Sequence, residues 1–237
     1  MSSTPDRSAD RLIDHLVIAI DGPSGSGKSS TSRGVADRLG LRYLDTGAMY
    51  RAMTWWLLRQ GVDVHDPAAV AARVEEPEIL SGTDPLGPTI MVDGVDVGLA
   101  IRSDEVNAAV SPVSTVPEVR TRLLHLQREV IGDGGIVVEG RDIGSVVAPD
   151  AEVKVYLTAD VSARAVRRAA EAGSGDVEAT RDSLLARDEI DSGRATAPLV
   201  MAEGAVHIDG TAYTLDEVVD LVVALVDAVG ATEERVP

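Results

Sequence analysis

One segment near the start of this 237-residue chain constrains the fold more than any other. Residues 16–20 (LVIAI) are apolar and mostly β-branched, as buried parallel strands are. Residues 22–29 (GPSGSGKS) then match the pattern G-x-x-x-x-G-K-[ST] in full. A helix is predicted from there to Leu39, before Gly40. This order of strand, glycine-rich loop and helix predicts a P-loop, which binds the phosphates of a nucleoside triphosphate.

The chemistry of phosphate binding explains the spacing of these residues. Glycines let successive backbone N–H groups point inward, and the N-terminus of the following helix adds partial positive charge. Lys28 is predicted to reach the β and γ phosphates of ATP, and the Ser29 hydroxyl to ligate Mg²⁺. The predicted ATP-binding residues are Gly22, Pro23, Ser24, Gly25, Ser26, Gly27, Lys28, Ser29 and Ser30.

Composition excludes several other classes of protein. The chain has no cysteine, which excludes disulfides, zinc–thiolate sites and cysteine nucleophiles. A net charge of −17 and an aromatic content of 3% argue against a nucleic-acid-binding surface. No apolar run approaches the roughly 18 residues of a membrane span, and the first 15 residues lack the apolar core of a signal peptide. We therefore expect a cytoplasmic monomer that binds neither membranes nor nucleic acid.

Short apolar runs alternate with helical patterns along most of the chain. Further strands are predicted at 42–44, 135–138, 153–157 and 205–208, and helices at 47–59, 117–131, 158–171, 177–189 and 215–229. This alternation predicts an α/β fold: a P-loop NTPase core with a parallel five-stranded sheet flanked by helices. Residues 62–100 contain several prolines and short β-like segments, which predict a small β-rich insert.

The predicted organisation divides the chain into a core, an insert and a helical lid. The ranges are a flexible tail (1–14), core with the P-loop (15–61), monophosphate-binding insert (62–110), core (111–160), lid and flanking helices (161–190), core (191–229) and a C-terminal tail (230–237).

Two arginines follow predicted core strands. Arg51 lies on the helix after the second strand, and Arg141 follows the third. Ligands bind at the carboxyl ends of strands in such sheets, so these side chains are expected to converge on an anion opposite the ATP phosphates. A second phosphate, that of an acceptor, is the group such a pair would hold.

At this point the sequence resembles bacterial cytidylate kinases. The resembling segments are 20–25, 44–51, 101–106, 140–144 and 194–199, in family order over most of the chain. The resemblance implies transfer of the γ-phosphoryl group of Mg·ATP to CMP or dCMP. It implies a catalytic set of Lys28, Arg51, Arg141 and Asp142. It also implies a CMP site formed by Thr46, Arg51, Ser111, Arg120, Arg141, Asp142, Arg187, Asp191 and Arg194.

The same resemblance assigns roles within this set. Ser111, Arg120 and Asp142 would read the cytosine edge. Arg51 and Arg141 would hold the acceptor phosphate. The remaining Arg187, Asp191 and Arg194 would surround the sugar and phosphate. Cytosine presents an amino donor and two acceptors, which a carboxylate or hydroxyl and an arginine complement.

The sequence departs from the family pattern at a few positions. Thr46 stands where a serine is common, and it keeps the hydroxyl. Glu139 stands where some members have Asp, so its carboxylate reaches one methylene further. Around Asp191, Ile190 and Ser192 replace arginines of some relatives, which weakens the local positive field.

Some residues have a second interpretation. Arg187 and Asp191 are four apart and could form an ordinary surface pair on a helix. Arg164, Arg167 and Arg168 share one helix, and we expect all three to close on the ATP phosphates, with Arg164 and Arg168 as binding residues. The alternative is a solvated basic face. Trp55 and Trp56 are expected to pack in the core, and the four histidines have no metal-ligand spacing.

Alternative functions remain open from the sequence. One is a P-loop kinase with a different acceptor, such as UMP, AMP, dTMP or shikimate. Another is a GTP-dependent switch, although the chain lacks an Asn-Lys-x-Asp motif. A structural or RNA-binding role is disfavoured by charge and aromatic content.

Overall fold

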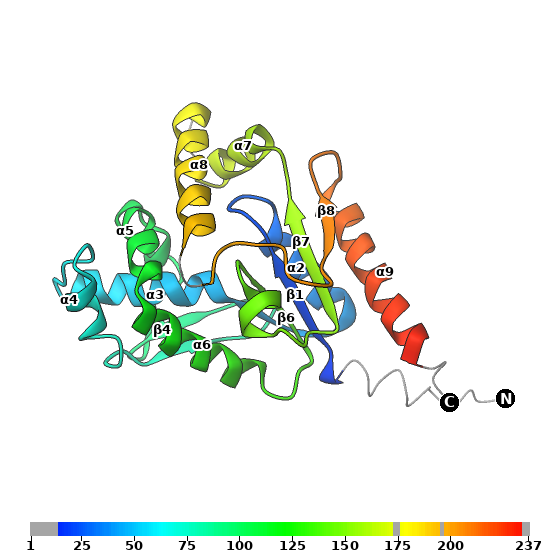
Figure 1. Ribbon diagram of the computed structural model, residues 1–237, viewed down its shortest axis with the longest axis horizontal. Helices are drawn as coiled ribbons and strands as arrows, with labels where there is room; N and C mark the ends of the chain where they lie inside the picture. The colour runs from blue at the N-terminus through cyan, green and yellow to red at the C-terminus, as the bar shows by residue number, and fades with distance from the viewer. Residues whose placement is uncertain (1–13, 173–175, 195–196, 234–237) are drawn as a thin grey trace.

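The computed structural model describes residues 14–172, 176–194 and 197–233 (Figure 1). A five-stranded sheet lies at its centre, in the order β2-β6-β1-β7-β8. Its strands are β1 (Val17–Asp21), β2 (Arg42–Asp45), β6 (Ile136–Gly140), β7 (Val153–Thr158) and β8 (Val206–Asp209). All four pairings are parallel. The predicted α/β class and the five core strands are confirmed.

Helices cover both faces of this sheet because alternate strand residues are apolar on both sides. Ile18, Ile20 and Val137 pack under α2 (Lys28–Leu39) and α9 (Leu215–Glu233). Ala19 and Val138 point to the other face, where α3 (Thr46–Arg59), α5 (Asp104–Thr115) and α6 (Pro117–Ile131) pack. Two apolar clusters thus clamp the strands, and their carboxyl ends are held at one edge.

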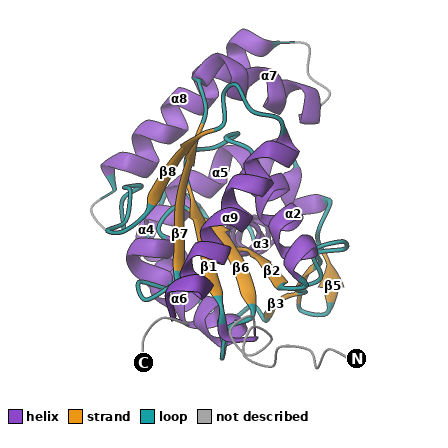
Figure 2. Cartoon of the chain, turned by 90° about the vertical axis from the view of Figure 1, so that its right-hand side faces the viewer, coloured by secondary structure: helices purple, strands orange, loops and turns teal. Residues whose placement is uncertain are grey.

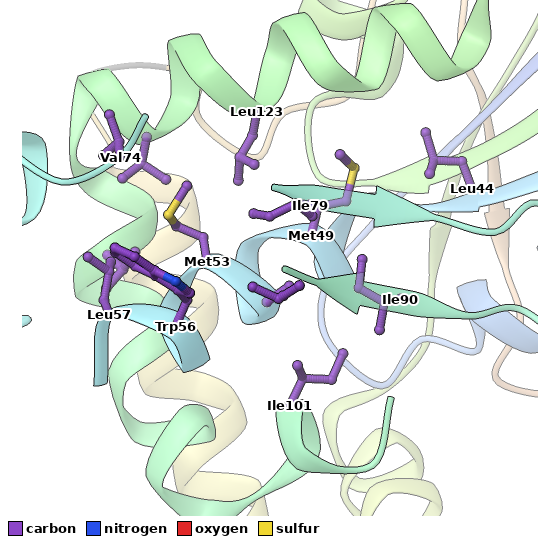
Figure 3. Close-up of a cluster of buried hydrophobic side chains, with 14 of the residues drawn as sticks. Leu44, Met49, Met53, Trp56, Leu57, Val74, Ile79, Ile90, Ile101 and Leu123 are labelled. Carbon is purple, nitrogen blue, oxygen red and sulfur yellow. The ribbon is translucent and has the colours of Figure 1, made fainter. Parts of the chain in front are cut away.

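The predicted insert is built on a small antiparallel sheet. Its strands are β3 (Ile79–Ser81), β4 (Ile90–Val92) and β5 (Val95–Asp96), in that order. It also contains α4 (Pro67–Ala71) and the 3₁₀ turn η1 (Ala100–Arg102), which the sequence patterns did not predict. Figure 3 shows Ile79 and Ile90 in one buried cluster with Met49, Met53 and Trp56 of α3. The expectation that the tryptophans pack in the core is confirmed for Trp56, which is buried, and Trp55 is half-buried against the same cluster.

Hydrogen bonds attach the insert to the core. Nε of Arg33, on α2, donates to the carbonyl of Pro85 at 2.7 Å, and its Nη2 donates to the carbonyl of Leu86 at 3.3 Å. The N–H of Tyr43, on β2, donates to the carbonyl of Thr83 at 2.9 Å. One loop of the insert therefore lies against both the P-loop helix and the edge strand of the sheet.

Two helices, α7 (Val161–Ala172) and α8 (Val177–Gly193), pack side by side beyond the carboxyl ends of the strands (Figures 1 and 2). They occupy the region predicted as a lid. Helix α8 extends past the predicted end at 189, and α9 past 229, while α5 runs through the predicted boundary at 110. The domain division itself stays a prediction, and the tails predicted at 1–14 and 230–237 lie mostly outside the described residues. Within the described ranges, no helix has the length and apolarity to span a membrane.

Candidate active site

A cavity lies where β1, β2 and β6 end. The P-loop, the start of α3, the turn after β6 and parts of α5, α7 and α8 form its wall. The structure brings fifteen predicted site residues to this wall: Ser24, Gly25, Gly27, Lys28, Ser29, Ser30, Thr46, Arg51, Ser111, Arg141, Asp142, Arg168, Arg187, Asp191 and Arg194. Five predicted residues do not line it: Gly22, Pro23, Ser26, Arg120 and Arg164.

The P-loop backbone explains its glycines. Gly22 has φ 151°, and a Cβ there would lie 2.0 Å from the carbonyl oxygen of Leu157. Gly27 precedes α2 in the left-handed region, with φ 96°, and no side chain caps the helix. The first backbone hydrogen bond into the helix is from Thr31 N–H to the Gly27 carbonyl. The N–H groups of Ser24 and Ser26 have partners in Asp188 and the Pro23 carbonyl. Those of Lys28, Ser29 and Ser30, at the start of α2, remain for an anion, as at other helix N-termini.

Lys28 is the first residue of α2 and is buried in the cavity wall. Its Nζ donates to the carbonyl of Pro23 at 2.7 Å, within the P-loop itself. Burial lowers its pKa and the Arg141 cation lowers it further, while Glu139 and Asp21 oppose the change. An incoming phosphate would favour the charged amine and offer it a better partner than the carbonyl.

Six arginines line the cavity, where burial and neighbouring positive charges disfavour the charged forms of Arg51 and Arg187. The six are Arg51, Arg102, Arg141, Arg168, Arg187 and Arg194. Burial and neighbouring arginines lower the pKa of Arg51 to about 9; burial and Arg141 lower that of Arg187 to about 10. Nε of Arg187 and Nη2 of Arg194 are buried and have no hydrogen-bond partner among the described residues. A bound anion would accept hydrogen bonds from these donors and would reduce the repulsion between the arginines.

Two contacts hold these arginines in place. Nη1 of Arg51 donates to Oδ1 of Asn107, on α5, at 2.6 Å. Nε of Arg141 donates to Oδ2 of Asp191, on α8, at 2.9 Å. Asp191 is 5% exposed, so the alternative of a surface pair between Arg187 and Asp191 is wrong. The carboxylate instead links α8 to the turn after β6.

A polar group of different character lies at another part of the wall. Nη2 of Arg120, on α6, donates to Oδ2 of Asp142 at 2.5 Å, and both residues are buried. Ser111, on α5, lines the cavity with Asp142, and the Tyr50 ring lies 5.5 Å from the Arg120 guanidinium carbon. Arg120 therefore stands behind Asp142. Burial raises the pKa of Asp142, against the arginines around it.

A buried carboxylate lies between the P-loop and this region. Glu139, on β6, accepts hydrogen bonds from the hydroxyls of Tyr43 and Ser29, and it lines the cavity with Asp45. Burial and the Asp45 charge raise its pKa, while Lys28 opposes them. The Thr46 hydroxyl donates to the Glu139 carbonyl at 2.7 Å, which fixes the end of β6. A serine hydroxyl beside a carboxylate suits the hard-oxygen preference of Mg²⁺.

The three arginines of α7 reach three different places, so the alternative of a solvated basic face is wrong. Nη1 of Arg164 donates to the Ser24 carbonyl at 2.9 Å and to Oδ2 of Asp188 at 2.6 Å. Arg167 donates to the Gly210 carbonyl at 3.0 Å, and Arg168 lines the cavity. The prediction that Arg164 contacts ATP phosphates needs a correction: its guanidinium holds the P-loop backbone, and Arg168 is the one on the cavity wall.

Comparison with known proteins places the chain in a family. The family model "Cytidylate kinase" matches residues 18–228. A cytidylate kinase of Streptomyces avermitilis is 54% identical over 224 residues, which cover 94% of this chain and 97% of that protein. Another, of Streptomyces coelicolor, is 58% identical over 214 residues, or 90% of this chain and 93% of that one.

The chain belongs to the cytidylate kinase family. The resemblance found in the sequence is thereby confirmed, and the chain is a kinase of this family. The alternatives of a GTP-dependent switch and of an RNA-binding protein are set aside. An uncharacterized protein from Eubacterium ventriosum has a similar fold, with a TM-score of 0.50 at 10% identity over 90% of this chain and 99% of that one.

Sequence patterns missed several residues of this site. The missed residues on the wall are Asp45, Gly47, Tyr50, Arg102, Val110, Ser114 and Gly140, whereas Glu139 was noted only as a departure. Tyr50 and Arg102 lie within the segments that resemble the family, so their place in those segments could have predicted them as site residues. Asp188, which also joins α8 to the P-loop region through Arg164, had no such signal.

A second hollow lies on the other side of the P-loop. It shares Gly25, Gly27 and Ser30 with the first cavity, so the loop forms a common wall. Its remaining lining comes from α2, β7, α7 and the segment around the start of α9: Ser26, Thr31, Leu157, Arg167, Gly210, Tyr213, Thr214, Leu215 and Val218. Ser26 faces this hollow rather than the first cavity.

Proposed function

We propose that the chain transfers the γ-phosphoryl group of Mg·ATP to CMP or dCMP, giving ADP and CDP or dCDP. One observation carries the proposal: a single cavity joins the P-loop to the pair Ser111 and Asp142, with six arginines on its wall. The P-loop suits a triphosphate, and buried unsatisfied guanidinium groups suit a second phosphate. Family membership favours cytosine over the other acceptors considered.

The base would be read by Asp142 and Ser111. Cytosine has an exocyclic amino group that donates and two ring acceptors. The Asp142 carboxylate is buried and already held by Arg120, so it can accept from that amino group without moving. Uracil presents a carbonyl oxygen at the same place, and it would leave the carboxylate facing an acceptor. That mismatch supports discrimination between CMP and UMP.

The reaction would proceed by direct in-line transfer. A phosphate oxygen of CMP attacks the γ phosphorus, the bond to the β–γ bridging oxygen breaks, and ADP leaves with that electron pair. The attacking oxygen is anionic near pH 7, so no general base is needed. Arg51 and Arg141 would hold the acceptor phosphate, and Lys28 with the loop N–H groups would stabilise charge on the donor. Positioning and charge stabilisation therefore supply the catalysis.

Magnesium fits the residues at the P-loop end of the cavity. The Ser29 hydroxyl would be a direct ligand, and the Glu139 carboxylate, hydrogen-bonded to Ser29 and Tyr43, would hold a bound water. When bound, Mg²⁺ supplies charge neutralisation between the β and γ phosphates.

The second hollow is proposed as the site of the adenine base and ribose of ATP. It adjoins the P-loop on the side away from Ser111 and Asp142, so a nucleotide there could extend its phosphates through the loop. Tyr213 and Leu157 supply apolar surface, and Arg167 supplies a cation next to it. A monomeric state and a cytoplasmic location remain predictions from the sequence.

An ADP-release assay tests the function. Mg·ATP is held constant with CMP, dCMP, UMP, AMP, GMP or dTMP as acceptor. We expect turnover with CMP, dCMP close behind, and UMP far weaker. Turnover with a different monophosphate alone would keep the kinase reaction and remove the cytosine assignment. ATP binding without acceptor-dependent turnover would overturn the proposal.

A further inference from the structure

Asp21 is a buried acid that the proposed mechanism does not use. It is the last residue of β1, directly before the P-loop, and is 3% exposed. Its Oδ1 accepts the N–H of Ile143 and its Oδ2 that of Gly144, each at 2.8 Å. These are the first two residues of η2 (Ile143–Val147), a single π-type turn after β6. A side chain from β1 therefore occupies the start of η2.

Asp21 caps η2 although Asp142, not Asp21, is the residue that directly precedes this turn. The first N–H groups of a helical turn lack partners within it, and an Asp at the preceding position commonly accepts from them. Asp142 holds that position, but its side chain makes no capping bond to η2. It pairs with Arg120 and lines the cavity instead. A carboxylate folded back onto its own turn would be lost to the cavity.

We propose that Asp21 is a positioning residue that caps η2 in place of Asp142, and so leaves the Asp142 carboxylate free to bind the acceptor base. This inference rests on the role proposed above for Asp142. Asp21 touches neither acceptor nor donor in this scheme and acts through the turn from Gly140 to Asp142. Through Asp21, strand β1, which leads into the P-loop, would hold the turn that carries Asp142.

The turn has little room to rearrange by itself. A Cβ at Gly140 would lie 2.6 Å from Oγ1 of Thr46 and 2.6 Å from Cδ1 of Ile143. At Gly144 a Cβ would lie 3.1 Å from Cβ of Ala202. The backbone on both sides of Asp142 is thus closely packed, and its position follows that of the N–H groups which Asp21 holds.

Charges around Asp21 are compatible with this role. The charged groups that act on it are Lys28 of the P-loop and Asp142 of the turn. Burial raises its pKa to about 6, and the two N–H donors work against that rise. The carboxylate is consequently ionised near neutral pH, which is the form that can accept two hydrogen bonds.

The central test is Asp21→Asn, which keeps the shape but has one acceptor oxygen and an amide NH₂ that cannot accept. One of the two N–H groups then loses its partner, and Asp142 becomes the nearest substitute. We expect the KM for CMP to rise by about tenfold, equivalent to about 1.4 kcal/mol. The preference for CMP over UMP should fall as well, with the KM for ATP within about threefold of wild type. Equal increases in both KM values would overturn the proposal.

Asp66→Ala is the control for a lost cap, because both N–H partners of Asp66 bond to its Oδ1, which an asparagine would keep. Asp66 also accepts two backbone N–H groups, those of Ala68 and Ala69 at the start of α4, and does not line the cavity. All kinetic constants of this variant should equal those of wild type. A change in CMP affinity there equal to that of Asp21→Asn would show that any lost cap has this effect, and would overturn the specific role of Asp21.

A double-mutant cycle separates this inference from the function on which it rests. If Asp21 acts through Asp142, Asp21→Asn adds little to the KM for CMP in an Asp142→Asn background. Unchanged CMP/UMP discrimination in Asp142→Asn alone overturns base reading by Asp142. Reduced discrimination in Asp142→Asn with wild-type values in Asp21→Asn overturns only the role of Asp21.

Wild-type protein supplies a readout that does not depend on the variant folding. In NMR spectra, the amide protons of Ile143 and Gly144 should shift with the same midpoint as the Asp21 carboxyl carbon, and should do so in an Asp142→Asn background as well. Amide shifts that do not follow Asp21 would overturn the cap.

Discussion

Oδ2 of Asp191 lies 2.9 Å from Nε of Arg141, and this hydrogen bond joins helix α8 to the turn that follows strand β6. Both residues line the cavity. Asp191 also forms an ion pair with Arg194, whose Nη1 lies 3.8 Å from Oδ1. One carboxylate thus compensates two arginines that would otherwise repel each other.

Removing that charge should impair transfer. Asp191→Asn leaves Arg141 without an anionic partner in a buried setting, so its orientation toward the acceptor phosphate is lost. We expect kcat/KM for CMP to fall by about 30-fold, equivalent to about 2 kcal/mol. Steady-state kinetics with CMP varied checks this. Asp182→Asn, at an exposed position of the same helix, is the control and should behave as wild type; a wild-type value for Asp191→Asn would contradict the prediction.

Lys28→Met should abolish transfer while the protein stays folded. The amine is needed only where negative charge gathers on the donor phosphates, so kcat should fall by at least about 100-fold. The free energy of unfolding should not fall, because a buried charge is removed. Lys154, on β7, is the only other lysine and donates to the Glu203 carbonyl, which makes Lys154→Met a control. Residual transfer near the wild-type rate would remove Lys28 from the mechanism.

Asp142→Asn should change which base is accepted. The amide can turn its NH₂ toward the carbonyl oxygen of uracil, so UMP gains what CMP loses. The ratio of kcat/KM for CMP to that for UMP should drop by about tenfold or more. Competition between the two acceptors in one reaction measures that ratio directly. An unchanged ratio would show that another group reads the base.

The pKa of Asp21 predicts how stability depends on pH. Its value is about 6 in the folded protein against an ordinary 3.8, so the folded state holds the proton more tightly. This stabilisation is present at low pH and is lost as pH rises through about 6. Relative to Asp21→Asn, the wild-type free energy of unfolding should fall by about 1 kcal/mol between pH 5 and 7. Urea unfolding of both proteins measures the difference; parallel curves would contradict it.

The core strands were predictable because their signal is local. A buried parallel strand needs consecutive β-branched residues, as in residues 16–20, and the glycine loop has its own pattern. The strand ends were placed one or two residues early. Polar residues such as Asp21 and Asp209 end the apolar pattern, yet they continue the hydrogen-bonded ladder.

Helix α5 could not be predicted from the local sequence pattern. Pro112 lies inside it, where proline removes a hydrogen bond, and the sequence therefore argues against a helix there. Buried Val106, Val110 and Val113 offset that loss by packing against the rest of the core. Because Ser111 lies on this helix, its place in the cavity depends on tertiary contacts.

The arginines of α7 show a different limit. Spacing along a helix predicts that Arg164, Arg167 and Arg168 share one region, and it cannot say where each long side chain ends. Their targets are set by the P-loop and by the Gly210 carbonyl, which are distant in sequence. The second hollow was missed for the same reason, since Tyr213 and Leu215 belong to no motif.

The hydrogen bonds from Arg33 to the Pro85 and Leu86 carbonyls bear on which elements can move when ligands bind. Arg33 lies on the helix that begins at Lys28, so these bonds join the insert to the helix that follows the P-loop. We expect any narrowing of the cavity on nucleotide binding to come mainly from α7 and α8. Arg164 of α7 bonds to the Ser24 carbonyl and to Asp188 of α8, so these bonds tie both helices to the P-loop. The acceptor would then enter a site in which the P-loop and the insert are already in place, and movement of α7 and α8 would complete it.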